Sequence, residues 1–267
     1  MWISNQTKSF QYLGGKYSIL PFVIPILQKA GHRHFVDVFG GSGVVILNMP
    51  QSPIETYNDL NNDIVNFFKV LRENTEELIS SLQLTPYSKF EYDLAVNLET
   101  DSAIEKARKF YIRTHQSIYA AGAQEKSKGW ACSINQSRNF KSEKVNKWIR
   151  SIESLDSVVA RFQNVQIENR DFRFIMKSYD SIDTLFYLDP PYDKTFRSST
   201  TYKFDFENQD FYDLHTWCKK VVGKVAVSGY DTPFMRSLFA DFNFHPGPLR
   251  KNTRTKRQAF ECIWTNY

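Results

Sequence analysis

Cysteine is scarce in this chain, and this scarcity limits the kinds of site the protein can contain. The 267 residues include only three cysteines, Cys132, Cys218 and Cys262, which lie far apart and form no Cys-x-x-Cys pair. This spacing argues against a disulfide framework and against a cysteine-based zinc site. The five histidines show no metal-ligand spacing either. We therefore expect free thiols and no bound metal.

Long apolar runs are also missing. No stretch approaches the roughly 20 apolar residues that a membrane-spanning helix needs, and residues 1–6 lack the basic and apolar regions of a signal peptide. We expect a protein that stays in the cytoplasm of the cell that makes it. Its 42% hydrophobic and 24% charged residues are ordinary for a globular protein. The length allows one large domain with an insertion, or two small domains.

Negative charge is scarce in one segment. Residues 104–150 contain eleven Lys and Arg but only three acids, a surplus of eight positive charges in a chain whose net charge is +5. The rest of the chain is therefore negative overall. A charge run is often only a solvated surface, but this one is interleaved with aromatic and amide side chains, which suits a polyanion. We expect this segment to contact nucleic acid.

A glycine-rich turn follows the first apolar strand. Residues 35–43 read Phe-Val-Asp-Val-Phe-Gly-Gly-Ser-Gly, and a second strand, 56–59, ends at Asp59 roughly 20 residues later. Asn61 is in the position to cap the helix that follows. In doubly wound sheets the glycines let a nucleotide approach the backbone, and the acid binds ribose hydroxyls. The fit to the usual G-x-G-x-x-G pattern is imperfect.

The most specific signal is the sequence Asp189-Pro190-Pro191-Tyr192 after an apolar strand at 184–188. Neither proline has a backbone N–H, so the turn offers carbonyl acceptors beside a carboxylate, with an aromatic face next to them. Such a cluster can hold a flat group that carries an NH₂, such as adenine or cytosine. Asp-Pro-Pro is also an ordinary turn at the end of a strand, and the four residues alone do not decide between these interpretations.

The order of the remaining elements predicts an α/β fold. About seven strands, mostly parallel, form a Rossmann-like sheet; the other expected strands are 165–168, 224–229, 242–244 and 259–264, with a basic loop at 250–257. Helices are expected at 19–29, 88–98, 102–120, 142–161 and 208–222, and a small hairpin at 129–139. Residues 75–163 lack buried-strand signals. We predict a catalytic domain made of residues 1–74 and 164–267, interrupted by a mainly helical recognition domain at 75–163.

In this order the motifs resemble those of the Dam-like class of DNA adenine-N6 methyltransferases, which use S-adenosylmethionine. The resemblance covers nearly the whole chain. Its motifs are Tyr12-Leu13-Gly14-Gly15-Lys16, the glycine turn at 37–43, Asn58-Asp59, Asn169-Arg170-Asp171-Phe172 and Leu188-Asp189-Pro190-Pro191-Tyr192. Residues 227–230 and 261–264 resemble later parts of family members.

The resemblance implies a role for each matching residue. Asp37, Phe39, Gly40 and Gly41 would surround the methionine part of the cofactor, and Tyr12, Gly14 and Lys16 would reach over it, with Lys16 near the DNA. Asp59 would bind the ribose, while Asp171 and Phe172 would hold the cofactor's adenine. The carboxylate of Asp189 and the carbonyl of Pro190 would receive the amine of the target adenine, with Pro191 completing the turn and Tyr192 stacking on a base swung out of the duplex.

The expected partner is double-stranded DNA. The predicted DNA contacts, besides Lys16, are Arg113, Gln116, Lys126, Lys128, Arg138, Asn139 and Arg197. Arg suits guanine, and Asn or Gln suits adenine, in the major groove, but plain phosphate contacts fit as well. The resemblance places the enzyme in a bacterial or phage-infected cell. We expect a monomer, and the sequence does not tell whether a restriction enzyme accompanies it.

Two other interpretations stay open at this point. Amino methyltransferases that act on cytosine N4, on RNA or on protein amides use a similar acid- or amide-Pro-Pro-aromatic turn. A DNA-binding homologue without catalysis would keep the basic segment but lose the cofactor residues, and Lys16, Asp37, Asp59 and Asp189 are all present. No Pro-Cys pair exists, which argues against a cytosine-C5 enzyme with a thiolate nucleophile.

Overall fold

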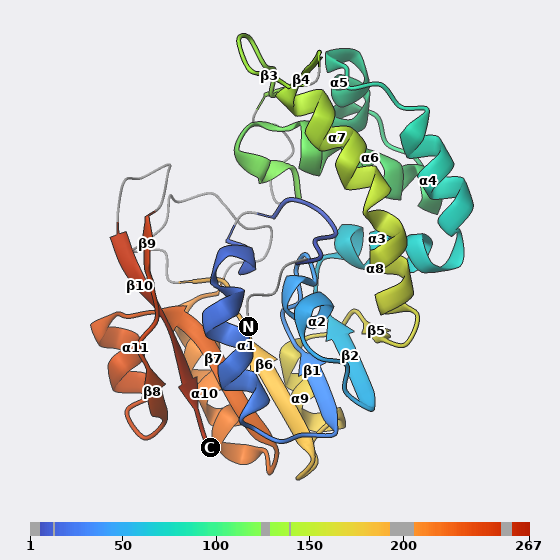
Figure 1. Cartoon of the computed structure of the whole chain (residues 1–267). Helices are drawn as coiled ribbons and strands as arrows, with labels where there is room; N and C mark the ends of the chain where they lie inside the picture. Colours follow the sequence, from blue (N-terminus) through green and yellow to red (C-terminus); the bar gives the residue numbers. More distant parts are fainter. Residues whose placement is uncertain (1–5, 13, 124–128, 139, 193–205, 252–257) are drawn as a thin grey trace.

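One mixed sheet forms the centre of the protein. The computed structural model describes residues 6–12, 14–123, 129–138, 140–192, 206–251 and 258–267 (Figure 1). The strand order is β5-β2-β1-β6-β7-β10-β8, and β9 pairs with β10 outside this path. The strands are β1 (His34–Asp37), β2 (Ile54–Asn58), β5 (Gln166–Glu168), β6 (Thr184–Leu188), β7 (Lys224–Tyr230), β8 (Asn243–His245), β9 (Leu249–Lys251) and β10 (Gln258–Thr265).

The sheet is mostly parallel, as predicted. β5, β2, β1, β6 and β7 run in the same direction, and β10 is antiparallel to β7, β8 and β9. Asp37 at the end of β1 is in register with Tyr57 of β2 and Tyr187 of β6. The carboxyl ends of these three strands therefore meet at one edge, where ligands bind in sheets of this kind.

Helices cover both faces of the sheet because side chains along each strand alternate between the two faces. Two apolar cores result, one on each face of the sheet. The first contains Phe35 and side chains of α1 and α2. The second contains its neighbour Val36 and side chains of α9, α10 and α11, and Figure 1 shows the positions of these helices. These helices are α1 (Leu20–Gln28), α2 (Val44–Asn48), α9 (Phe172–Ser178), α10 (Asn208–Lys220) and α11 (Pro233–Leu238). A short 3-10 helix (Tyr17–Ile19) precedes α1.

The middle of the chain is helical and extends beyond the sheet at one end of the molecule (Figure 1). Helix α6 packs against α3, α4, α5 and α7. The helices of this part are α3 (Asn62–Glu73), α4 (Thr75–Gln83), α5 (Lys89–Asn97), α6 (Ala103–Gln116), α7 (Glu143–Glu153) and α8 (Leu155–Phe162). Within the described residues, no helix is both long and apolar enough to span a membrane.

Helix α8 fastens this part to the sheet through a buried ion pair. The guanidinium of Arg161 donates to Oε1 of Glu55 in β2 at 2.6 Å and to the carbonyl of Ile46 in α2 at 2.8 Å, and it also contacts Oε2 of Glu55. Glu55 is fully buried. The three elements are therefore held in a fixed relation next to the glycine turn.

Three predicted elements differ from the structure. The helix expected at 102–120 ends at Gln116, because Ser117 is extended and bridges to Trp130; a 3-10 helix (Ile118–Ala123) follows. The helix expected at 142–161 is two helices that meet at Ser154. The strand pair expected at 129–139 lies further along, as β3 (Ser137–Arg138) and β4 (Lys141–Ser142), with Phe140 at a φ of 58° between them.

Candidate active site

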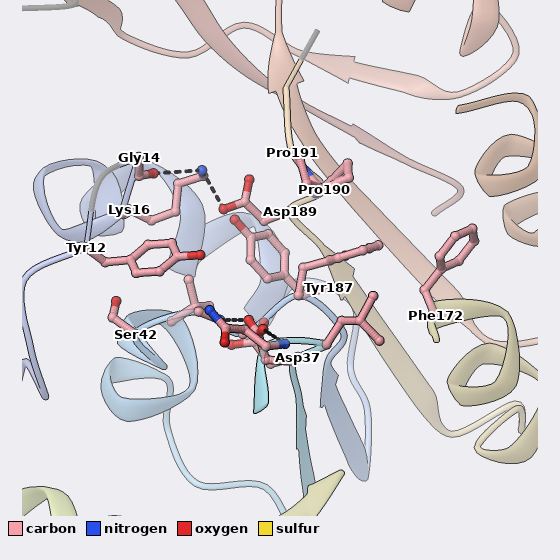
Figure 2. Close-up of a pocket in the computed structure, with 18 of the residues that line it drawn as sticks. Tyr12, Gly14, Lys16, Asp37, Ser42, Phe172, Tyr187, Asp189, Pro190 and Pro191 are labelled. Atoms are coloured by element: carbon pink, nitrogen blue, oxygen red, sulfur yellow. Dashed lines mark hydrogen bonds and ion pairs between the residues drawn. The ribbon is translucent and has the colours of Figure 1, made fainter. Parts of the chain in front are cut away.

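A pocket of about 430 Å³ lies at the carboxyl ends of β1, β2 and β6 (Figure 2). All residues that the sequence suggested for catalysis or cofactor binding line it. These are Tyr12, Gly14, Lys16, Asp37, Phe39, Gly40, Gly41, Asp59, Asp171, Phe172, Asp189, Pro190, Pro191 and Tyr192. The fold thus brings five separate sequence motifs into one cavity, while the role of each residue remains a prediction.

The glycine turn after β1 has a steric cause. A Cβ atom on Gly40 would lie 2.1 Å from the ring of Tyr57, which is fully buried beneath the turn and donates its hydroxyl to the carbonyl of Gly41 at 2.6 Å. Gly41 itself has a φ of 51°, a backbone conformation that glycine adopts without strain. The turn therefore lies flat on Tyr57 and leaves its other side open to the pocket.

Asp37 presents an acceptor without a partner to the pocket. Its side chain is 1% exposed, and no described residue makes a hydrogen bond to Oδ2. Burial, with the nearby charge of Asp189, raises the pKa of Asp37 to about 8. A buried carboxyl group of this kind is ready for a cationic or N–H donor, such as the ammonium of an amino acid.

Asp59 lies at the end of β2 and is fixed by two backbone donors. Oδ2 accepts from the N–H of Gly41 at 2.8 Å, and Oδ1 accepts from the N–H of Asn61 at 2.7 Å. Burial raises the pKa of Asp59 to about 6, although these two hydrogen bonds oppose the shift. Each oxygen still has a lone pair that can accept from a hydroxyl group.

The far end of the pocket is aromatic. The rings of Phe39, Phe172 and Phe206 lie 5.5–5.7 Å apart, centroid to centroid. The guanidinium of Arg173 lies over Phe172, 4.4 Å from the ring centroid. A flat ring of a ligand would find apolar faces here. Phe206 and Arg173 line the pocket, and the sequence interpretation missed both.

Asp171 begins α9 and is already engaged. Its Oδ1 accepts from the N–H of Arg173 at 2.8 Å, as a helix cap does, and its Oδ2 lies 3.0 Å from the Arg173 guanidinium. The same guanidinium bonds to Asp210 and Asp213 of α10. Arg173 therefore joins two helices at the rim of the pocket.

The Asp-Pro-Pro-Tyr turn lies next to the N-terminal glycine loop. Nζ of Lys16 is 2.6 Å from Oδ2 of Asp189 (Figure 2). It is also 2.9 Å from Oε1 of Glu261 in β10. Burial alone would lower the pKa of Lys16, but the two carboxylates outweigh it and raise that pKa well above its usual value. The lysine is therefore a buried ammonium between two acids.

Asp189 keeps one acceptor for a ligand. Among the described residues, Oδ1 is buried and has no hydrogen-bond partner. Burial raises the pKa of Asp189, Lys16 opposes this shift, and the charge of Glu261 adds to it. The next ring in the turn, Tyr192, donates its hydroxyl to Glu261 at 2.6 Å, lies 3.1 Å from Oγ of Ser228, and packs against Tyr230.

Two predicted DNA contacts point into the protein. Gln116 is 0% exposed: its Oε1 accepts from the N–H of Ser88 and from Nε1 of Trp130, so reading a base edge would require it to leave the core. Arg113 donates to the carbonyl of Ala95 at 3.1 Å and lies 3.5 Å from Asp63. Neither side chain therefore points outward, where it could reach a groove of bound DNA.

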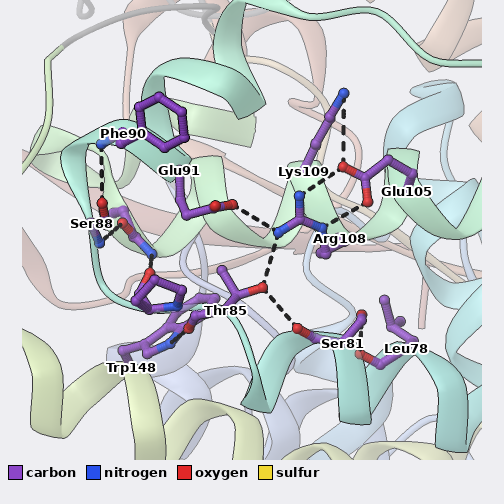
Figure 3. Close-up of polar contacts among 12 residues, drawn as sticks. Leu78, Ser81, Thr85, Ser88, Phe90, Glu91, Glu105, Arg108, Lys109 and Trp148 are labelled. Carbon is purple, nitrogen blue, oxygen red and sulfur yellow. Dashed lines mark hydrogen bonds and ion pairs between the residues drawn. The ribbon is translucent and has the colours of Figure 1, made fainter.

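Other basic residues of this segment are also internal. Arg108 bonds to Glu91, Glu105 and Thr85 (Figure 3). Lys109 donates to the carbonyl of Leu98. Lys106, Lys141, Lys147 and Arg150 are exposed. Part of the positive charge thus stabilises the helical packing. The predicted contacts Lys126, Lys128, Asn139 and Arg197 lie outside the described residues, as does the side chain of Arg138.

The mostly parallel sheet thus brings the sequence motifs together in one pocket at the carboxyl ends of its strands. Residues 12–252 match the family of D12 class N6 adenine-specific DNA methyltransferases. The chain therefore belongs to this family: it is an N6-adenine DNA methyltransferase that depends on S-adenosylmethionine, and DNA is its substrate.

Individual relatives are distant but cover most of the chain. The type II methyltransferase M1.LlaDCHI of Lactococcus lactis subsp. cremoris is 26% identical over 96% of this chain and 94% of its own length. The type II methyltransferase M.MjaIII of Methanocaldococcus jannaschii is 23% identical, with 96% and 98% covered. The DNA N-6-adenine-methyltransferase of Escherichia phage P1 is 23% identical over 90% of this chain, which corresponds to 32% of the phage protein.

Proposed function

We propose that the enzyme methylates adenine within a specific DNA sequence, on a base swung out of the duplex, and that Asp189 and Pro190 receive the N6 amine. The observation that carries this proposal is Oδ1 of Asp189, which is buried, has no hydrogen-bond partner among the described residues, and lines the same pocket as Asp37 and Asp59. A buried acceptor without a partner is costly, and an N–H donor from the target base would satisfy it.

The remaining pocket residues would hold the cofactor. The partnerless Oδ2 of Asp37 fits the ammonium of the methionine part, Asp59 fits the ribose hydroxyls, and the faces of Phe39 and Phe172 fit the adenine. S-adenosylmethionine supplies a methyl group bound to a positively charged sulfur. Tyr12 lines the pocket beside Gly41 and would cover the cofactor there.

The chain's own part in the reaction is to orient the amine and to stabilise its charge. The lone pair of an adenine amine is delocalised into the ring, so the amine is a poor nucleophile. Asp189 and the carbonyl of Pro190, by accepting its two hydrogens, favour a tetrahedral nitrogen whose lone pair points at the methyl carbon. S-adenosylmethionine would supply the methyl group, whose S–C bond would break as the C–N bond forms, and the carboxylate of Asp189 would stabilise the positive charge that the nitrogen gains. The surplus proton then leaves to Asp189 or to water.

The helical part at 75–163 would bind the DNA. Its support is its position beyond the sheet, its exposed basic residues Lys106, Lys141, Lys147 and Arg150, and the pairing of β3 with β4 at its edge. Phosphate contacts would position the duplex. Lys126, Lys128, Arg138, Asn139 and Arg197 stay candidates for this surface, whereas Arg113 and Gln116 are given structural roles. Helix α8 belongs to the interface with residues 1–74 and 164–267, the proposed catalytic domain.

We propose a monomer that works in the cytoplasm of a bacterial or phage-infected cell, where both DNA and S-adenosylmethionine are present. Long-read detection of modified bases in DNA from cells expressing the chain tests the proposal and gives the target motif. We expect methylated adenine at one short sequence, and none with Asp189→Ala, whose DNA affinity should stay within about threefold of wild type because phosphate contacts carry it. Unchanged methylation by Asp189→Ala would contradict the assignment.

A further inference from the structure

A buried glutamate in the last strand is joined to both sides of the proposed amine site. Glu261 is 2% exposed and lies opposite Tyr230 of β7, next to the apolar residues 262–264. Burying a carboxylate is costly unless it is paired. Such a residue in the interior of a strand therefore calls for an explanation beyond packing.

Two of its partners are the side chains next to Asp189. Oε1 of Glu261 is 2.9 Å from Nζ of Lys16 and 2.6 Å from the hydroxyl of Tyr192. Lys16 lies 2.6 Å from Asp189, and its ammonium is 4.7 Å from the ring centroid of Tyr192. The Lys16 ammonium thus contacts both Glu261 and Asp189. Glu261 also fixes the orientation of the Tyr192 ring, which belongs to the same turn as Asp189.

The charges of Lys16, Asp189 and Glu261, taken as these three side chains, do not cancel. One ammonium is shared by two carboxylates, so Lys16, Asp189 and Glu261 together carry one negative charge. A pair of Lys16 and Asp189 alone would be neutral, and the ammonium would hold the carboxylate that the amine needs. A nitrogen that becomes positive during methyl transfer is stabilised by the first arrangement and much less by the second.

We propose that Glu261 is a positioning residue for methyl transfer: it shares the Lys16 ammonium with Asp189, so that this ammonium offsets only part of the charge that the ionised Asp189 carboxylate presents to the incoming amine. This inference rests on the proposed role of Asp189. It assigns Lys16 a defined place between two acids, and it explains why the last strand contains a buried acid at this point.

The test is the pH dependence of Glu261→Gln, which removes one charge but keeps an acceptor for the Tyr192 hydroxyl. Single-turnover methylation should slow by about tenfold or more, while the affinities for S-adenosylmethionine and DNA stay near those of wild type. The acidic limb of the rate profile should move to lower pH, because the charge of Glu261 raises the pKa of Asp189. The ionisable groups that face Asp189 are Lys16, Asp37, Tyr187, Tyr192 and Glu261.

A matched control exists at the other edge of the sheet. Glu168 in β5 accepts from the hydroxyl of Tyr179 at 2.6 Å and does not line the pocket. Glu168→Gln should change neither the rate nor the acidic limb. A slower Glu261→Gln enzyme whose acidic limb stays in place would show that Glu261 only supports the fold, and this would overturn the proposal.

A second comparison tests whether Glu261 acts through Lys16. If Glu261 acts through Lys16, then Lys16→Met and the double variant Lys16→Met/Glu261→Gln should methylate at the same rate, within about twofold. A further loss of about tenfold in the double variant would overturn the proposal. An active Asp189→Ala variant would instead refute the proposed function, so the two failures are distinguishable.

Discussion

Replacing Asp37 by asparagine should make the ligand-free protein more stable at alkaline pH. The carboxyl group of Asp37 is buried, and its Oδ2 has no partner among the described residues, so ionisation is opposed and its pKa rises to about 8. In the unfolded chain the pKa is about 3.9. The folded state therefore holds the proton more tightly, and the contribution of Asp37 to stability falls as the pH rises from about 4 to about 8.

The size of the effect follows from the two pKa values. Between about pH 5 and about pH 8.5, ionisation of Asp37 destabilises the wild type on the order of 4 kcal/mol. Asparagine has the same shape and does not ionise. For a chain of this size, the melting temperature of Asp37→Asn relative to wild type should rise by roughly 10 °C between these two pH values.

Thermal unfolding followed by circular dichroism, without cofactor, measures this difference. Asp101→Asn is the control, because Asp101 is exposed; its melting temperature should follow that of wild type at every pH. If the difference between Asp37→Asn and wild type is the same at both pH values, Asp37 is ionised at no cost, and the argument for a waiting acceptor in the pocket is wrong.

Three other measurements address the pocket and its support. Binding of S-adenosylmethionine at neutral pH should release most of one proton, because an ammonium beside Asp37 lowers its pKa from about 8. Calorimetry in buffers of different ionisation enthalpy measures this release, and Asp37→Asn should abolish it. Gly40→Ala should lower stability by about 1–3 kcal/mol in urea unfolding, through the clash with Tyr57. Arg161→Met should cost about 3–5 kcal/mol by leaving Glu55 buried and unpaired, and a variant as stable as wild type would contradict this.

The sequence predicted the sheet because its signals are local. Apolar strands such as 184–188 end in residues with a recognisable use, and Asn61 caps α3 by accepting from the N–H of Asp63, as its position indicated. The N-terminal glycine loop was assigned to the site only because the sequence resembles the family, since no local pattern placed it there. Parallel strands bring their carboxyl ends together, so the predicted residues met in one pocket.

Other features depend on contacts that no local pattern reveals. Glu261 lies in an apolar strand, and partners distant in the sequence, including Lys16, 245 positions earlier, make a buried acid tolerable there. The positive charge of the helical segment predicted a surface, but Arg108 and Lys109 are used inside it. Gln116 looked like a base reader because of its residue type, while packing against Trp130 placed it in the core.

The contact of Lys16 with Glu261 also has a consequence for biosynthesis. The contact joins Lys16, which lines the pocket, to a side chain 245 positions later in the chain, in a strand that lies between β7 and β8 in the sheet. A nascent chain whose residue 261 is still inside the ribosome cannot make this contact. The enzyme should therefore gain activity only after residue 261 has left the ribosome, and a fragment that lacks β10 should leave Lys16 without the acid of Glu261.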